Sequence, residues 1–294
     1  MRILLFGSSG QVGWELQRSL ATLGELVALG SDRADFAQPE SLAGTVRTLQ
    51  PDVIVNAAAH TAVDKAESEP ARAHAINAEA PGVLAREAAT LGAWLVHYST
   101  DYVFDGSGVR PWVEDDATGP LSVYGRSKLE GEVRVRASGC RHLILRTSWV
   151  YSARGGNFAR TMLRLAAERD RLQVIDDQVG APTGADLLAD VTAHTVRTAL
   201  HSPEVAGTYH ATAAGETSWH GYARLVVEWA RAEGRAIKVA PESIVAVPTS
   251  AYPTPARRPL NSRLSTQRLQ RTFGLTMPPW QAGVLRMLAE LHGN

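Results

Sequence analysis

Tyr124 and Lys128, in the stretch Tyr124-Gly-Arg-Ser-Lys128, are the residues whose types and spacing best suit catalysis. On a helix they would lie on one face, one turn apart. A phenol has an ordinary pKa of about 10, and an ammonium about 4–6 Å away stabilises its anion and lowers that pKa. By itself the pair also fits a tyrosine that packs on a lysine stem at the start of a helix. A function in proton transfer therefore depends on what lies nearby.

The hydroxyl of Thr100 is the first such neighbour. It ends the apolar stretch that begins at Trp94, which is typical of a buried strand, and ligands bind at the carboxyl ends of strands in open α/β sheets. There a hydroxyl can hydrogen-bond an oxygen whose charge changes during hydride transfer. Ser99 is a weaker candidate, because strand alternation turns its side chain to the other face. We therefore expect Thr100, Tyr124 and Lys128 to form the catalytic set.

A glycine-rich turn supplies a second feature. Gly7, Gly10 and Gly13 lie between the first apolar stretch and a helical pattern. Glycines allow a tight turn and a close approach of backbone to a ligand, and the start of a helix offers amides and a positive dipole end to phosphates. The alternative is a tight strand–helix turn without a ligand. With this context we expect a dinucleotide cofactor.

The end of the second strand leaves the choice of cofactor open. A carboxylate there favours NAD and a basic residue favours NADP. Gly30 follows the strand, and Asp32 and Arg33 offer both chemistries slightly later in the chain. The next pair, Asp35 and Phe36, is placed to flank an adenine, or else belongs to a surface loop. We expect NADH or NADPH.

The pattern of elements indicates how these residues are positioned. Apolar strands alternate with helices through the first 150 residues, which predicts an α/β fold with a doubly wound parallel sheet. We assign 1–150 to a dinucleotide-binding domain, with 185–215 returning to it. The remaining parts, 151–184 and 216–294, would form a smaller, interleaved α/β substrate-binding lobe. The four prolines between Val247 and Pro259 exclude regular helix or central strand there.

The composition narrows the class of protein. The chain has 294 residues, with 30 basic and 30 acidic side chains, so no basic surface for nucleic acid is expected. Cys140 is the single cysteine, which excludes a disulfide framework. The first apolar stretch is too short for a signal peptide or a membrane span. We therefore expect a cytoplasmic protein that engages neither membrane nor nucleic acid.

Together these motifs resemble the extended short-chain dehydrogenase/reductase superfamily, which implies a Rossmann-type fold. The resemblance includes Asn56-Ala-Ala-Ala-His-Thr61 and Ser99-Thr-Asp-Tyr-Val-Phe104. More narrowly, Arg146-Thr-Ser-Trp-Val-Tyr151, Gly180-Ala-Pro-Thr-Gly184 and the 247–263 segment are similar to the dTDP-4-dehydrorhamnose reductase family. This resemblance implies an NAD(P)H-dependent reductase of the 4-keto group of dTDP-6-deoxy-L-lyxo-4-hexulose. The product would be dTDP-L-rhamnose for cell-surface polysaccharide such as lipopolysaccharide.

The resemblance also implies a role for each site residue. Tyr124 would protonate the C4 oxygen, Lys128 would lower the pKa of Tyr124 and bind the nicotinamide ribose, and Thr100 would hydrogen-bond the same oxygen. The cofactor would lie along Gly7, Gly10, Gln11, Val12, Gly13, Asp35, Phe36, Ala59, His60, Thr61, Tyr124 and Lys128. The dTDP-sugar would contact Thr100, Asp101, Tyr124 and Trp149.

Further features have competing interpretations. The resemblance suggests Mg²⁺ at a homodimer contact, held by Glu15, Asp186 and Glu290, although acids on helix surfaces are usually solvated. The arginines around the proline-rich segment, Arg257, Arg258 and Arg263, are candidates for contact with the diphosphate. Trp149 stacks on sugar or base, or packs in the core.

Two rival functions also stay open. One is another enzyme of the superfamily, such as a nucleotide-sugar 4-epimerase that keeps its cofactor bound. The other is a non-catalytic, cofactor-binding regulatory subunit, against which the intact set of Thr100, Tyr124 and Lys128 argues.

Overall fold

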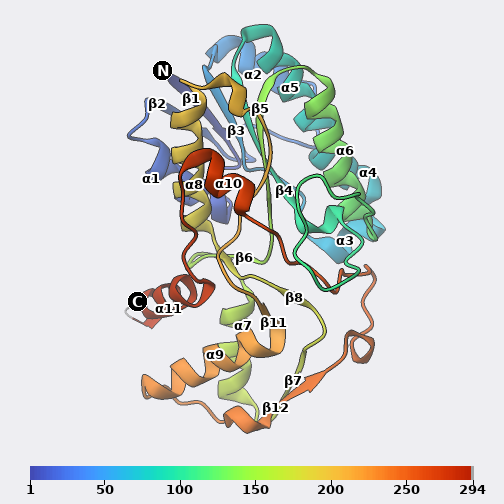
Figure 1. Cartoon of the computed structure of the whole chain (residues 1–294), viewed down its shortest axis with the longest axis vertical. Coiled ribbons are helices and arrows are strands. Elements are labelled where there is room, and N and C mark those ends of the chain that lie inside the picture. Colours follow the sequence, from blue (N-terminus) through green and yellow to red (C-terminus); the bar gives the residue numbers. More distant parts are fainter. Residues whose placement is uncertain (293–294) are drawn as a thin grey trace.

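Six apolar segments form one parallel sheet in the computed structural model, which describes residues 1–292 (Figure 1). The strands are β1 (Arg2–Phe6), β2 (Glu25–Leu29), β3 (Val53–Asn56), β4 (Trp94–Thr100), β5 (Arg141–Thr147) and β10 (Gly207–His210), in the order β10-β5-β4-β3-β1-β2. Every neighbouring pair is parallel. The strand order reverses between β1 and β3, where ligands bind in this class of sheet. The predicted doubly wound α/β fold is therefore confirmed.

Strand alternation gives the sheet two buried faces. In β1, Ile3 and Leu5 join one core and Leu4 and Phe6 join the other. The first core is covered by α1 (Gln11–Leu20), α8 (Ala185–Ala199) and α10 (Gln267–Phe273). The second is covered by α2 (Ser41–Leu49), α5 (Ala80–Leu91) and α6 (Val123–Ala137). Because both faces are covered, a ligand site of this sheet is expected at the strand ends.

The helical run between β3 and β4 differs from a single regular helix. The sequence predicts one helix from about residue 70 to 91, whereas the chain forms α3 (Val63–Ser68), α4 (Pro70–His74), a π-helical turn (Ala75–Glu79) and then α5. A Cβ on Gly131 of α6 would lie 2.2 Å from the carbonyl oxygen of Asn77 in this turn. The glycine therefore lets α6 pack directly against the π turn.

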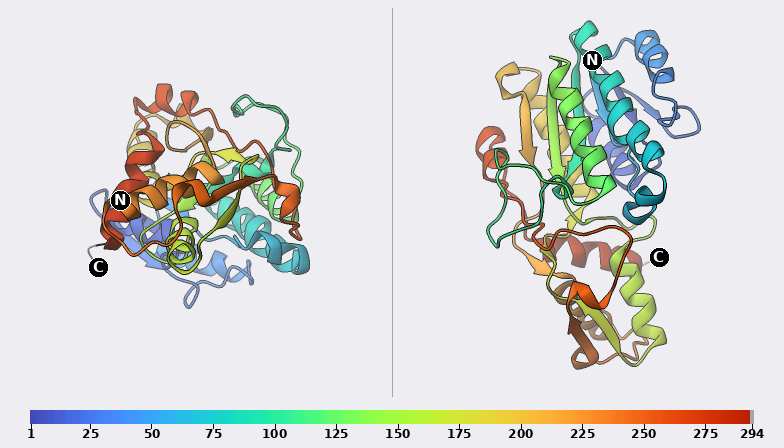
Figure 2. Two further views of the ribbon diagram at one scale, coloured as in Figure 1. Left: turned by 90° about the horizontal axis from the view of Figure 1, so that it is seen from below. Right: turned by 90° about the vertical axis from the view of Figure 1, so that its right-hand side faces the viewer.

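The remaining elements form a second group below the strand ends (Figure 1; Figure 2, right). They are β6 (Val150–Tyr151), α7 (Phe158–Glu168), β7 (Leu172–Ile175), β8 (Val179–Gly180), β9 (Thr183–Gly184), β11 (Thr217–Ser218), α9 (Trp219–Ala232), β12 (Ile244–Val247) and α11 (Trp280–His292). The short pairs are β12 with β7, β11 with β8, and β6 with β9. Single 3₁₀ turns lie at Asp101–Val103, Pro203–Val205, Pro241–Ser243 and Thr249–Ala251.

This second group has its own apolar core. Tyr222, Val226 and Val284 are buried there against Trp280, which is 4% exposed. Meanwhile α8 and β10 pack with the sheet, so the chain passes between the two groups more than once. The division into a dinucleotide-binding domain and a substrate-binding lobe stays our interpretation. None of the helices within residues 1–292 has the length and apolar character needed to span a bilayer.

Candidate active site

The glycine-rich turn fits tightly between β1, β3 and α1. Gly7 has φ +79°, and a Cβ there would lie 2.6 Å from the amide nitrogen of Ala58. A Cβ on Gly13 would lie 2.0 Å from the carbonyl oxygen of Gly7, so only glycine allows α1 to pack on the turn. Gly10 caps α1, which starts at Gln11, while the side chain of Val12 packs toward the sheet. This close backbone cradle at a helix start suits a pyrophosphate.

The residues expected beside the adenine behave differently from each other. Phe36 is buried and contacts Phe6 edge to face, with ring centroids 5.5 Å apart. Asp35 is exposed and accepts a hydrogen bond from the amide of Ala37 at 2.9 Å. Asp32 and Arg33 are both exposed beside Gly30. Like the sequence, these contacts therefore favour neither NADH nor NADPH as the cofactor.

The loop after β3 carries Ala59, His60 and Thr61, and Asn77 holds it. The backbone N–H of His60 donates to Asn77 Oδ1 at 2.8 Å, and Asn77 Nδ2 donates back to the His60 carbonyl oxygen at 3.1 Å. The same amide nitrogen lies 3.1 Å from Ser127 Oγ in α6. Asn77 therefore ties the expected cofactor loop to the helix that carries Tyr124. The sequence motifs do not indicate Asn77, whose only signal is a polar side chain inside an apolar helical pattern.

Thr100 lies at the end of β4 and is 5% exposed. Its Oγ1 accepts a hydrogen bond from the amide of Tyr102 at 3.2 Å and donates to Asp101 Oδ1 at 3.0 Å. A further hydrogen bond joins the side chains of Thr100 and Tyr124. Ser99 faces the opposite way, with its hydroxyl 2.6 Å from Glu132 Oε1, as strand alternation predicts.

The start of α6 fixes Tyr124. Ser122 caps the helix through a hydrogen bond from the amide of Gly125 at 3.2 Å. A Cβ on Gly125 would lie 2.3 Å from the Tyr102 carbonyl oxygen, so the glycine lets the helix approach the turn after β4. The rings of Tyr102 and Tyr124 meet edge to face, with centroids 5.4 Å apart. Lys128 follows one turn later and is 2% exposed.

The protonation states differ from the expectation for Tyr124. Burial raises the pKa of Tyr124 to about 12, while its hydrogen bond with Thr100 acts in the opposite direction. Lys128 is not placed to counter this, because its ammonium donates to the carbonyl oxygen of Tyr98 at 2.6 Å. Burial also lowers the pKa of Lys128 to about 8. Our prediction that Lys128 lowers the pKa of Tyr124 is therefore wrong for this state, and the phenol keeps its proton at neutral pH.

Asp101 is buried beside these groups. Burial raises its pKa to about 6, while the side chains of Ser262 and Thr100 act to lower it. Its Oδ2 is buried with no hydrogen-bond partner. Ser262 comes from the far end of the chain, and no local pattern in the sequence indicates it.

Trp149 lies between β5 and β6 and packs against the second group of elements. It has φ +49°, which is unusual for a residue with a side chain, and its ring stacks on Trp219 with centroids 3.7 Å apart. Trp219 Nε1 in turn donates to Gln178 Oε1 at 3.0 Å. Trp149 as a whole is half-buried.

Two of the three arginines near the proline-rich segment line one cavity. This cavity has a volume of about 580 Å³, within the usual range for small-molecule sites, and Tyr252, Arg257 and Arg258 line it. Arg258 forms an ion pair with Asp64 at 2.8 Å, whereas Arg263 pairs with Glu216 at 2.8 Å. Arg257 is exposed at the cavity wall.

The residues expected to bind Mg²⁺ do not assemble a site. Asp186 forms an ion pair with Arg286, and Glu15 lies 3.9 Å from Arg18. Glu290 lines a different cavity, beside Trp14 and Arg154. Over residues 1–292 there is no group of three or more His, Cys, Asp or Glu side chains arranged to hold a metal. The expectation of a magnesium site is therefore not supported, because cations of the chain itself already neutralise two of the carboxylates.

Comparisons with known proteins point to one family along almost the whole chain. Residues 1–292 match the family model described as RmlD substrate binding domain. The dTDP-4-dehydrorhamnose reductase of Shigella flexneri is 60% identical over 99% of this chain and 98% of its own length. The enzyme of that name from Burkholderia thailandensis is 52% identical over 97% of each chain.

Solved structures agree with this result. The crystal structure of a dTDP-4-dehydrorhamnose reductase from Clostridium acetobutylicum has a TM-score of 0.88 and 35% identity, over 99% of this chain and 100% of that one. The Bacillus anthracis protein of the same name, solved in complex with NADP, has a TM-score of 0.87 and 32% identity, over 98% and 99% of the two chains. The chain belongs to the RmlD substrate-binding-domain family, that of the dTDP-4-dehydrorhamnose reductases.

Proposed function

We propose that this protein is an NAD(P)H-dependent reductase that converts dTDP-6-deoxy-L-lyxo-4-hexulose to dTDP-L-rhamnose, the last step in making that nucleotide sugar. One observation carries the chemistry: Tyr124 hydrogen-bonds Thr100, and burial raises its pKa to about 12. A phenol that keeps its proton at neutral pH can give it to a carbonyl oxygen, as ketone reduction requires. Membership in the reductase family supports the choice of substrate.

The cofactor would lie across the glycine-rich turn. A Cβ on Gly7 or Gly13 would fill this cradle, which fits close approach of a pyrophosphate to Gly7, Gly10 and Gly13 and to the helix start at Gln11 and Val12. Asp35 and Phe36 would border the adenine, and Ala59, His60 and Thr61 the middle of the cofactor. When bound, the reduced nicotinamide supplies the hydride to C4 of the sugar.

The chain's own residues would handle the proton. Tyr124 donates its hydroxyl proton to the C4 oxygen as negative charge develops there, and Thr100 hydrogen-bonds that oxygen. Lys128, whose ammonium donates to the Tyr98 carbonyl oxygen, would give its other N–H groups to the nicotinamide ribose. The tyrosinate then regains a proton from solvent.

Substrate binding would use the second group of elements. Asp101 and the half-buried Trp149 would contact the dTDP-sugar, and at least one of Arg257, Arg258 and Arg263 would contact the diphosphate. The cavity of about 580 Å³ supports the placement of the diphosphate beside Arg257 and Arg258, which line it. A nucleotide sugar and NAD(P)H are metabolites of the cytoplasm, where we place the reaction. We also propose a homodimer, which sedimentation would test.

The direct test is to supply the dTDP-4-keto-6-deoxy-L-sugar and to follow the oxidation of NADH and NADPH separately. We expect turnover with release of oxidised cofactor and formation of dTDP-L-rhamnose, with both cofactors used. Purified protein that retains stoichiometric NAD and interconverts nucleotide sugars without net oxidation would instead indicate an epimerase. Folded protein that oxidises neither NADH nor NADPH would contradict the proposed reductase activity.

A further inference from the structure

Ser262 lies 138 residues along the chain from Tyr124, yet it is buried beside the candidate catalytic groups. Its side chain neighbours the carboxyl of Asp101. Asp101 Oδ1 accepts the hydroxyl of Thr100 at 3.0 Å, whereas Asp101 Oδ2 is buried with no hydrogen-bond partner. Thr100 in turn interacts with the side chain of Tyr124. Four adjacent polar side chains thus lead from Ser262 to the phenol.

The direction of the Thr100 hydrogen bond indicates what Ser262 could do in the reaction. Thr100 has a single hydroxyl hydrogen, and it points to Asp101. To hydrogen-bond the reacting oxygen as a donor, Thr100 must turn that hydrogen away from Asp101. A buried carboxylate that loses a donor is costly unless another donor compensates. The Ser262 hydroxyl, beside the Asp101 carboxyl with its unpartnered Oδ2, can be that other donor.

The surrounding backbone holds Ser262 firmly in place. Its amide donates to the carbonyl oxygen of Val179 in β8 at 2.8 Å. A Cβ on Gly180 would lie 3.1 Å from the Ser262 Cβ and 3.0 Å from the ring of Trp149. Ser262 therefore packs beside the strand that supports the proposed substrate-facing tryptophan.

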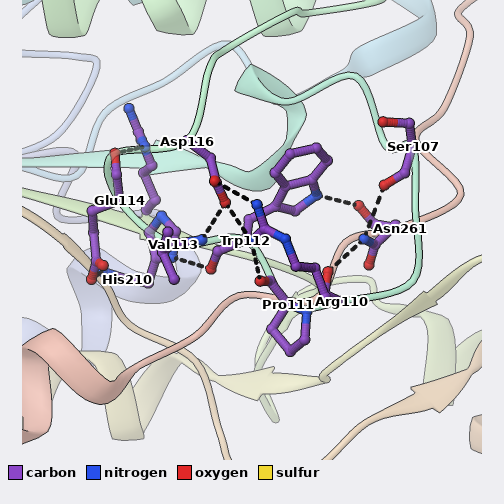
Figure 3. Close-up of polar contacts among 10 residues, drawn as sticks. Ser107, Arg110, Pro111, Trp112, Val113, Glu114, Asp116, His210 and Asn261 are labelled. Atoms are coloured by element: carbon purple, nitrogen blue, oxygen red, sulfur yellow. Dashed lines mark hydrogen bonds and ion pairs between the residues drawn. The ribbon is translucent and has the colours of Figure 1, made fainter.

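The preceding residue, Asn261, fixes the other side of this segment (Figure 3). Its amide Nδ2 donates to the carbonyl oxygens of Arg110 at 2.8 Å and Ser107 at 3.2 Å. Its own carbonyl oxygen accepts the indole N–H of Trp112 at 3.1 Å, and its backbone N–H donates to Gly106 at 3.0 Å. The loop after Asp101 and the strand β8 thus meet at Asn261 and Ser262.

We propose that Ser262 is a positioning residue of the reductase: it holds the Asp101 carboxylate in place while Thr100 turns its hydroxyl toward the reacting oxygen. This inference depends on the proposed function, since it assigns a role in that reaction. Ser262 acts through Asp101 and Thr100. The segment that carries it also contacts β8, so the substrate side and the proton-donating side share one support.

The test compares Ser262→Ala with Ser265→Ala, a matched loss of a hydroxyl three residues on in the same segment. Hydrogen bonds to charged groups typically contribute enough to change a rate by about tenfold or more. We expect Ser262→Ala to lower kcat about tenfold, with KM for NADPH unchanged, and Ser265→Ala to behave as wild type. Ser262→Cys carries a weak donor of similar size, so its kcat should lie between those of the two alanine variants. It replaces Ser262→Ala in the test if that variant does not fold.

A pH profile separates positioning from a general loss of structure. Asp101, with a pKa near 6, should give an inflection in kcat that Asp101→Asn removes. Its charged and titratable neighbours are Tyr102 and Tyr124, with Asp64 and Arg258 beyond Tyr102. In Ser262→Ala this inflection should move to higher pH, because the carboxylate has lost a donor. An active wild type with an unchanged kcat and inflection in Ser262→Ala would overturn the inference, whereas an inactive wild type would overturn the proposed function with it.

Discussion

The two sides of the candidate site are held by different means. On the sheet side, Thr100, Tyr124 and Lys128 are fixed by strand ends and by glycines whose Cβ would clash with backbone. On the other side, Trp149 is stacked on another side chain, and Arg258 is held by an ion pair with Asp64. Backbone packing leaves a residue little freedom, whereas side-chain pairs can be exchanged for a ligand. We therefore expect sheet-side changes to affect kcat or folding and changes on the other side to affect KM.

The largest effect should follow from Tyr124→Phe. The variant keeps the ring packed on Tyr102 but removes the proton that the reaction consumes. General acid catalysis contributes about 10²–10⁴-fold, so kcat should fall by that amount with little change in the Kd for NADPH. Steady-state kinetics and cofactor fluorescence titration measure the two quantities. A kcat within a few-fold of wild type would show that Tyr124 is not the acid.

Gly13→Ala tests whether the backbone cradle is as tight as its geometry indicates. The added Cβ would lie 2.0 Å from the Gly7 carbonyl oxygen, so α1 must shift. We expect the free energy of unfolding in urea to fall by about 1–3 kcal/mol, with weaker NADPH binding.

The matched control is Gly44→Ala in α2, where an added Cβ would have no neighbour within 4 Å. This variant should gain about 0.4–1 kcal/mol, because alanine restricts the unfolded chain. If the two substitutions changed the free energy of unfolding equally, the glycine-rich turn could relax around the added Cβ. Backbone packing would then not be what distinguishes the sheet side of the site.

Arg258→Ala probes the other side of the site. If Arg258 leaves Asp64 for the diphosphate, its removal should raise KM for the dTDP-sugar about tenfold and leave kcat within a factor of two. The control is Arg224→Ala, which breaks an exposed pair with Glu228 on α9 and should change neither constant. An unchanged KM in Arg258→Ala would show that Arg258 does not bind the diphosphate and only pairs with Asp64.

The same contrast explains what the sequence could predict. The catalytic set was predicted from spacing, because Tyr124 and Lys128 share a helix and Thr100 ends a strand, so local rules bring each to the sheet edge. Asn77 and Ser262 were missed because their partners, His60 and Asp101, are distant in the sequence and only packing brings them together. The metal prediction failed for a similar reason: Arg286, which pairs with Asp186, lies 100 residues away in the chain. The pKa of Tyr124 also depends on burial, which spacing does not report.

The smallest effect concerns Lys128 and the alkaline side of the pH profile. Burial lowers the pKa of its ammonium to about 8, so the charged form predominates below that pH and is lost as the pH rises through it. Loss of the charge weakens the proposed hydrogen bond from Lys128 to the cofactor ribose, so kcat should halve near pH 8 and fall up to tenfold per further pH unit. Lys128→Met should be slow at every pH and lack this inflection. If instead the variant keeps the inflection, the titrating group is a residue other than Lys128, and the alkaline limit does not come from this ammonium.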